Sequence, residues 1–277
     1  MPENTQALLS DQPPGGPAEP EGLSAWELDK VRRMNEAEGK LTGYDCPVCH
    51  NKGLIYLSMD TVRECECMTV RRGLTRASKS SLSRDMLAQY TFSHYSVTAE
   101  WQQRTKAEAM TYAKSPAGWF YIGGQPGAGK THLCVAIMNR LLKAGWSGRY
   151  MEWRSSAQAL KAVMNTPEYV QLMEQYQKAP LLYIDDLFKV QGGGAVPPGD
   201  INIAVDLLYS RYNHPDRLTI ISSEWTLQQL MDIDEGIASR TKERAGKNVL
   251  SILKDRDKNF RIQKAAGKAA NALARDV

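Results

Sequence analysis

The sequence lacks the features that mark membrane proteins, secreted proteins and strongly basic proteins. No apolar run approaches the roughly 18 to 20 residues of a membrane span, and the N-terminus, MPENTQALLSDQPPGGP, shows no basic-then-apolar secretion signal. The charge excess is mild, since 35 Lys and Arg against 31 Asp and Glu give a net charge of +4. We therefore expect a cytoplasmic protein with no membrane partner, and the net charge alone does not decide for or against nucleic acid.

The amino-acid composition is that of a globular chain. Of the 277 residues, 42% are hydrophobic and 24% are charged, which is enough apolar material for a sizeable core. The length favours one α/β domain of about 100 to 200 residues with a smaller attachment. Residues 1–22 hold five of the 13 prolines and are expected to form a disordered tail, and residues 264–277 are expected to form a flexible basic tail.

The positive charge is concentrated in two parts of the chain. Residues 71–90, interpreted as a basic linker, contain Arg71, Arg72, Arg76, Lys79 and Arg84, and from Thr241 to the end ten bases face four acids. Both stretches could follow a phosphate backbone. The alternative is that these side chains only solvate helix faces, and it has similar weight for each stretch alone. Together the two stretches favour a nucleic-acid partner.

Residues 23–70 are predicted to form a helix followed by a zinc-binding module. Ser24-Ala-Trp-Glu27 is a capping box, which predicts a helix to about Glu38. A cysteine cluster then follows as C-x₂-C-x₁₅-C-x-C, formed by Cys46, Cys49, Cys65 and Cys67. Disulfides are disfavoured in the cytosol, so clustered thiols there predict a tetrahedral Zn²⁺ site. The residues between the two cysteine pairs, 53–57 and 61–62, are expected to form a hairpin.

Two alternatives to a four-cysteine zinc site stay open. His50 adjoins the first pair, so a site with three cysteines and one histidine is possible. The four thiols could also be free. Cys134 lies inside a predicted helix and is interpreted as a core residue. In so small a segment, the metal is expected to replace a hydrophobic core.

The second half of the chain alternates short β-branched or aromatic runs with helical stretches. This alternation is typical of βαβ units and predicts an α/β fold with a parallel sheet. Five strands are expected, at residues 119–122, 149–153, 181–184, 218–222 and 249–253.

The segment GQPGAGKT matches the phosphate-loop pattern G-x-x-x-x-G-K-[ST] at every fixed position. It directly follows a predicted strand and opens a helix, as the motif requires. Lys130 is expected to contact the β- and γ-phosphates and Thr131 to ligate Mg²⁺, while the glycines let the backbone N–H groups approach the anion. A glycine-rich turn without a nucleotide is the weaker alternative. The predicted nucleotide-binding residues are Gly124, Gln125, Pro126, Gly127, Ala128, Gly129, Lys130, Thr131, His132 and Asp185.

The apolar run 181–184 ends in two adjacent carboxylates, Asp185 and Asp186. Ligands of open α/β sheets gather at the carboxyl ends of strands, so Asp185 is expected to hold Mg²⁺ beside Thr131. Asp186 stands where a residue would orient or activate the attacking water, with one methylene less reach than Glu. We expect slow hydrolysis. That the two acids only cap the next helix is the alternative.

The motifs GGQPGAGKTHL, LLYIDDL, TIISSEWTLQQL and IASRTKER together resemble the AAA+ ATPases of the DnaC/DnaI helicase-loader type, including phage-encoded forms. The resemblance covers roughly residues 90–262. It implies an AAA+ P-loop domain over residues 91–263, with a five-stranded parallel sheet and little or no C-terminal lid. It also implies an N-terminal helicase-binding module, ATP-dependent ring or spiral self-assembly, and delivery of a hexameric replicative helicase onto single-stranded DNA.

The resemblance also assigns roles near the γ-phosphate. Glu224 stands where the family places a polar sensor, with Ser223 as the alternative. Arg240 matches the arginine finger that completes a neighbouring subunit's site, and Arg211 and Arg244 are weaker candidates. The pair Phe260-Arg261 looks like the late aromatic-Arg signature of loaders.

Two other functions stay open beside helicase loading. One is an IstB-type transposition regulator acting on duplex DNA, against which the zinc module argues. The other is a nucleotide-gated adaptor with little hydrolysis, suggested by Asp186 and Glu224. A small-molecule kinase is less favoured, because nothing in the sequence resembles its acceptor site or lid.

Overall fold

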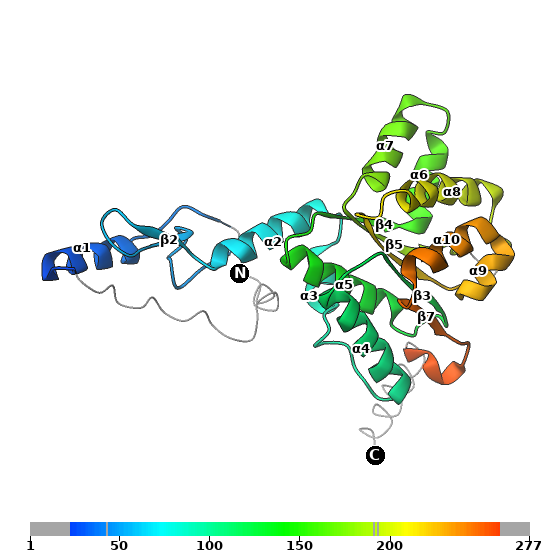
Figure 1. Cartoon of the computed structure of the whole chain (residues 1–277), viewed down its shortest axis with the longest axis horizontal. Coiled ribbons are helices and arrows are strands. Elements are labelled where there is room, and N and C mark those ends of the chain that lie inside the picture. Colours follow the sequence, from blue (N-terminus) through cyan, green and yellow to red (C-terminus); the bar gives the residue numbers. More distant parts are fainter. Residues whose placement is uncertain (1–22, 43, 191, 193, 261–277) are drawn as a thin grey trace, which may run out of the picture. The chain divides into compact units, whose positions relative to one another are not determined.

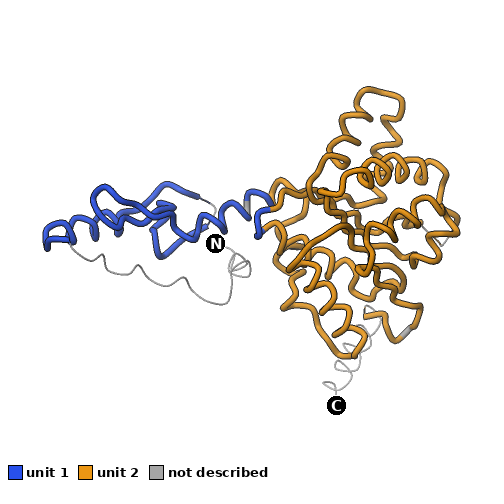
Figure 2. Tube along the Cα trace, viewed as in Figure 1, with its two compact units in different colours: residues 1–76, 143–145 blue, residues 77–142, 146–277 orange. Residues whose placement is uncertain are grey.

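The computed structural model describes residues 23–42, 44–190, 192 and 194–260. The chain divides into two compact units (Figure 2): unit 1 comprises residues 1–76 and 143–145, and unit 2 comprises residues 77–142 and 146–277. The predicted tails, 1–22 and 264–277, lie outside the described residues. Within the described ranges, no helix combines the length and the apolar character needed to cross a membrane.

Unit 1 contains a helix, a hairpin and most of a second helix (Figure 1): α1 (Ala25–Glu36), β1 (Leu54–Tyr56), β2 (Val62–Glu64) and α2 (Cys67–Lys79). The predicted capping box closes the start of α1. Ser24 Oγ accepts from the N–H of Glu27, and the carboxylate of Glu27 accepts from the N–H of Ser24. Strands β1 and β2 pair antiparallel. The predicted helix and hairpin are confirmed.

The segment interpreted as a basic linker, 71–90, is mostly helical. It contains most of α2 and all of α3 (Arg84–Gln89). Arg71 is only 8% exposed, and its guanidinium donates to the carbonyl oxygens of Thr42 and Tyr44, each at 2.6 Å. Arg71 therefore braces unit 1 from inside and is not available to a phosphate backbone.

Unit 2 is a parallel sheet with helices on both faces (Figure 1). Its strands lie in the order β4-β5-β6-β3-β7, and every pairing is parallel. All five predicted strands are confirmed: β3 (Trp119–Gly124), β4 (Gly148–Glu152), β5 (Leu181–Leu187), β6 (Leu218–Ser223) and β7 (Val249–Ile252). The remaining elements are α4 (Glu100–Lys114), α5 (Lys130–Lys143), α6 (Trp153–Ala162), α7 (Pro167–Gln177), α8 (Pro198–Tyr212), α9 (Leu227–Ile233), α10 (Glu235–Ala245) and η3 (Arg256–Lys258).

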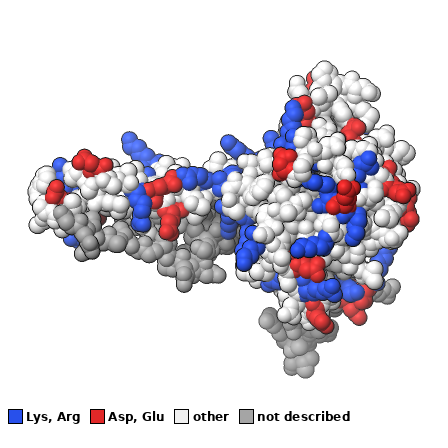
Figure 3. Space-filling model, viewed as in Figure 1, with Lys and Arg blue, Asp and Glu red and all other residues white. Residues whose placement is uncertain are grey.

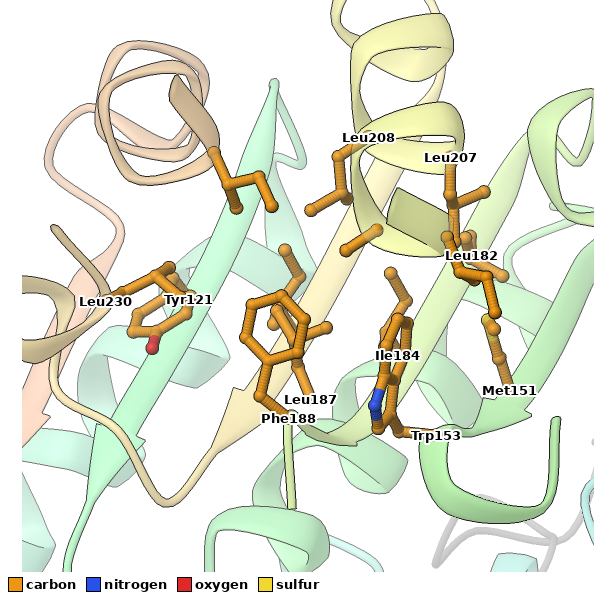
Figure 4. Close-up of a cluster of buried hydrophobic side chains, with 14 of the residues drawn as sticks. Tyr121, Met151, Trp153, Leu182, Ile184, Leu187, Phe188, Leu207, Leu208 and Leu230 are labelled. Atoms are coloured by element: carbon orange, nitrogen blue, oxygen red, sulfur yellow. The ribbon is translucent and has the colours of Figure 1, made fainter. Parts of the chain in front are cut away.

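The main core of unit 2 lies between one face of the sheet and helices α6, α8, α9 and α10 (Figure 4). Alternate side chains of β5, such as Leu182 and Ile184, point into it and meet Leu207 and Leu208 of α8. Each such side chain contributes about 1.5 to 3 kcal/mol through the removal of apolar surface from water. This packing fixes the carboxyl ends of β3, β5 and β6, where the functional residues gather.

Candidate nucleotide and metal sites

The loop of residues 124–129 connects β3 to α5 and has no room for side chains at its glycines. Gly127 and Gly129 have positive φ values of 74° and 83°. A Cβ added at Gly127 would lie 2.2 Å from Asn259 Oδ1, and one at Gly129 would lie 2.9 Å from a ring carbon of Tyr95. The positive φ values and these close neighbours favour glycine at both positions. This backbone cradle at the start of a helix suits a phosphate group.

Lys130 is the cation of this loop and is 5% exposed. Its Nζ donates to the carbonyl oxygens of Gly124 and Gln125, both at 2.9 Å. Burial lowers the pKa of Lys130, although the charges of Asp186 and Glu224 oppose that effect. A buried ammonium held only by neutral carbonyls is poorly compensated, so the site favours an anion such as a polyphosphate.

Asp185 is the centre of a group of hydroxyls at the end of β5. Its Oδ1 accepts from Thr131 Oγ1 at 3.0 Å, Ser222 Oγ at 2.6 Å and Tyr183 OH at 2.5 Å, and its Oδ2 accepts from Tyr150 OH at 3.0 Å. The structure thus brings together Thr131 and Asp185, the two residues predicted to hold Mg²⁺. A buried carboxylate oxygen beside a threonine hydroxyl is the hard oxygen donor set that this ion prefers.

Asp186 lies where β5 departs from regular pairing. The pair Ile184 and Ile221 is followed by Leu187 and Ser223, so β5 has one residue more than β6 here. Asp186 occupies this bulge with a positive φ of 57°. Bulges of this kind turn a side chain away from the strand's alternation and are common next to active sites.

The Asp186 carboxylate is paired with a lysine that the sequence analysis did not single out. Lys189 Nζ lies 2.5 Å from Asp186 Oδ2 and 3.3 Å from Glu224 Oε1. The structure therefore joins two predicted catalytic residues, Asp186 and Glu224, through one ammonium. Ser223, the alternative sensor, is fully buried and donates to Leu187 O at 2.7 Å.

His132 lies in the first turn of α5 and contacts the segment that precedes α4. Its Nε2 lies 2.7 Å from Thr91 O, and its ring is 5.1 Å from that of Tyr90 and 5.2 Å from that of Tyr95. Burial raises the pKa of Tyr95 to about 12, so its hydroxyl stays protonated. Sequence reasoning missed both tyrosines, because isolated aromatics ahead of the motif carry no spacing signal.

The chain after β7 returns to the phosphate loop. The N–H of Asp255 donates to Gln125 Oε1 at 3.0 Å, and the N–H of Phe260 donates to Gly127 O at 3.1 Å. The Phe260 ring lies 6.3 Å from that of Trp101 on α4. Phe260, the first residue of the predicted aromatic-Arg signature, therefore lies against the loop, and Arg261 lies outside the described residues.

The three arginines proposed as fingers differ in availability. Arg240, on α10, is partly exposed and lies over the ring of Tyr209 at 3.8 Å from its centroid. Arg211 is fully buried, and its guanidinium donates to Thr219 and to carbonyl oxygens that include those of Ala179 and Leu218. Arg211 is therefore a structural residue and cannot reach a neighbouring subunit. Arg244 is partly buried, with a weak 3.5 Å contact to His214 O.

The four predicted zinc ligands converge in unit 1. The sulfur atoms of Cys46, Cys49, Cys65 and Cys67 all lie within 4.8 Å of one another, and all four residues are buried. His50 is not part of this group. Burial raises the pKa of Cys65 and Cys67 above the ordinary thiol value. At Cys49, the Gly53 N–H and the neighbouring thiols outweigh burial and lower the pKa to about 7. Four converging buried thiols fit a tetrahedral zinc ion, which would supply the missing positive charge.

Comparison with known proteins gives a consistent picture. Residues 60–245 match the family described as IstB-like ATP binding protein. The uncharacterized protein YqaM of Bacillus subtilis is 36% identical over 136 residues, which are 48% of this chain and 42% of YqaM. The phage-like element PBSX protein XkdC, also of Bacillus subtilis, is 25% identical over 245 residues, 78% of this chain and 88% of XkdC.

A fold match agrees with these relatives. A putative primosome component from Streptococcus pyogenes serotype M3 superimposes with a TM-score of 0.51 at 17% identity, over 65% of this chain and 96% of that protein. At that identity the likeness concerns the fold alone. The match to YqaM spans less than half of that relative's length. The predicted AAA+ P-loop fold is confirmed.

Proposed function

Because the chain belongs to the family of IstB-like ATP binding proteins, we propose that it is an ATP-dependent loader of a replicative DNA helicase. In this proposal it binds the hexameric helicase, assembles with further copies of itself on ATP, and delivers the helicase onto single-stranded DNA. The observation that carries the proposal is the union of a four-cysteine unit with a phosphate-loop unit of an ATP-binding family in one chain. Unit 1 is then the helicase-binding module.

The residues of unit 2 divide the work of ATP hydrolysis in this proposal. The loop N–H groups and Lys130 bind the phosphates, and Asp185 with Thr131 holds Mg²⁺, which offsets the charge of the phosphates when it is bound. Asp186 orients the attacking water and accepts its proton. Glu224, or Ser223 beside it, responds to the terminal phosphate.

Arg240 of one subunit is proposed to reach the nucleotide of the next. Arg240 is a partly exposed residue of α10, whereas Arg211 is enclosed by its own subunit. Charge that develops on the phosphoryl oxygens is stabilised most by a donor held in position beforehand. The ring of Tyr209, at 3.8 Å, is such a support for Arg240.

Single-stranded DNA is proposed to bind to the assembled form. Figure 3 shows Lys and Arg interspersed with Asp and Glu on the visible face of unit 2, so this face carries no large patch of positive charge alone. A single subunit would then neutralise few phosphates, and several subunits in a row would neutralise many. Binding should accordingly weaken with salt by a slope of about −0.7 per phosphate contacted on a single strand.

The salt slope therefore tests the proposal. We expect a steep slope with ATP and a shallow one without it, and a shallow slope under both conditions for Arg240→Ala. Arg104→Ala, at an exposed arginine outside both basic stretches, is the control and should behave as wild type. One slope shared by all these conditions would make DNA binding a property of the single subunit and would refute ATP-gated assembly.

Two observations favour second candidates. The matching family is described as IstB-like, which favours a transposition regulator acting on duplex DNA. The pairing of Asp186 with Lys189 favours an adaptor that is gated by nucleotide and hydrolyses little of it. A stable complex with a helicase separates loading from the first, and measured turnover separates it from the second.

A further inference from the structure

Lys189 lies at the carboxyl edge of the sheet, between two acids to which the proposed mechanism gives different tasks. Its Nζ contacts Asp186 Oδ2 at 2.5 Å and Glu224 Oε1 at 3.3 Å. Asp186 is on β5 and Glu224 directly follows β6, so the ammonium bridges two neighbouring strands. Without it, two carboxylates would face each other beside the phosphate site.

The backbone around Lys189 is held in an unusual conformation. Phe188 has a positive φ of 59°, which is rare for a large side chain. Its ring is fully buried at 5.4 Å from that of Trp153, and its carbonyl oxygen accepts from Trp225 Nε1 at 3.0 Å. Such strain persists only where the surroundings enforce it, and it clusters at functional sites. Because Phe188 is anchored, the backbone of the next residue, Lys189, is held in a position from which its side chain reaches Asp186.

A turn completes this placement. The N–H of Lys189 donates to Asp186 O at 3.0 Å, so the lysine folds back over the aspartate that precedes it by three residues. Burial alone would lower the pKa of Lys189, but the hydrogen bond and the charge of Asp186, with Glu224, raise it above the ordinary value. The ammonium is therefore charged at every pH at which the enzyme would work.

We propose that Lys189 is an autoinhibitory clamp: it holds Asp186 and Glu224 in a paired, inactive arrangement, and ATP hydrolysis requires its release. The inference rests on the proposed ATPase site and adds a regulation of that site. A carboxylate turned toward an ammonium is not turned toward the attacking water, so Asp186 can take the proton only after the pair separates. Lys189 acts through Asp186 and is a positioning residue.

The size of the effect follows from the exposure of the pair. The side chains of Lys189, Asp186 and Glu224 are 37%, 25% and 33% exposed, so water screens both contacts. Partly exposed ion pairs are weak, and breaking two of them corresponds to roughly a three- to tenfold change in rate. Removal of the ammonium should therefore raise turnover by about that factor.

The test is single-turnover ATP hydrolysis by the full chain at saturating ATP, with ATP affinity measured separately. Lys189→Met keeps the length of the side chain without its charge and should raise the hydrolysis rate about three- to tenfold. Lys189→Arg keeps the charge and should stay at the wild-type rate. Lys178→Met, which removes a surface lysine 2.8 Å from Glu174, is the matched control and should change nothing.

Three outcomes would overturn the clamp. An unchanged or lower rate for Lys189→Met would overturn it, and weaker ATP binding by the same variant would identify Lys189 as a phosphate contact. Equal increases in hydrolysis rate for Lys189→Met and Lys189→Arg would show that the charge of Lys189 does not inhibit hydrolysis. Bound ATP that neither wild type nor Lys189→Met hydrolyses would also refute it. Helicase loading is judged separately by complex formation, which Lys189→Met should leave intact, so the two ideas can fail independently. Any rise must vanish when Lys130→Ala is added.

Discussion

Removal of zinc is expected to unfold unit 1 while unit 2 continues to bind ATP. Apart from the cysteines, the buried apolar side chains among the described residues of unit 1 are Val31 and Ile55. Burial of two such side chains is worth about 3 to 6 kcal/mol. Two such side chains are a small core for a unit of this size. A structural zinc site in a small domain contributes about 10 to 16 kcal/mol of folding free energy, so we expect the unit to unfold when the metal is removed.

Two variants separate the metal from other effects. Cys46→Ser removes one of the four converging sulfurs and should abolish stoichiometric zinc. His50→Asn removes the histidine that adjoins the first cysteine pair, and because His50 has a φ of 46°, asparagine suits its backbone. That variant should keep about one zinc per chain.

The assay combines metal analysis, limited proteolysis and nucleotide binding. Wild type and His50→Asn should contain zinc and resist cleavage within residues 44–70. Cys46→Ser and chelator-treated protein should be cleaved there and should bind ATP with affinity within about twofold of wild type. A metal-free preparation with an intact, protease-resistant unit 1 would refute the reasoning, and loss of zinc from His50→Asn would show that the ligand set is wrong.

The remaining predictions concern unit 2. Lys130→Ala should lose ATP binding or turnover, because the loop then lacks its cation. Undiminished hydrolysis would show that the nucleotide does not bind at this loop. Asp186→Asn should bind ATP but hydrolyse it more slowly in single-turnover assays, and loss of binding with intact metal affinity would exchange the roles of the two aspartates. Arg211→Met should lower the free energy of unfolding by about 3 to 5 kcal/mol, because buried carbonyl oxygens lose their donors, whereas exposed Arg104→Met should change it by about 0.5 kcal/mol or less. Denaturant titration measures both, and equal effects would contradict the structural role of Arg211.

Local patterns predicted much of the fold. The capping box at Ser24 and the five strands of the sheet depend on residues within one turn or one strand, and the structure confirms them. The contact between Thr131 and Asp185 also followed from the sequence, because the two motifs have a fixed relation at the carboxyl edge of a parallel sheet. The sheet's strand order did not follow, since periodicity carries no information about neighbours.

Features that depend on distant contacts were missed. Tyr150, Tyr183 and Ser222 come from three different strands and converge on Asp185. Lys189 reaches Asp186 because of a bulge and a left-handed Phe188, neither of which has a sequence signature in a non-glycine segment. A second limit concerns charge: the sequence cannot distinguish an arginine on a solvated helix face from one that braces the interior, as Arg71 and Arg211 do.

Complex formation with the helicase tests the central claim most directly. The full chain, with ATP, is mixed with the hexameric replicative helicase of the cell in which it functions and separated by size exclusion, with Cys46→Ser in parallel. Helicase loading predicts that wild type elutes with the helicase and that Cys46→Ser does not, although both bind ATP. Wild type that never elutes with the helicase, but forms an ATP-dependent filament on duplex DNA, would contradict loading and identify a transposition-type regulator.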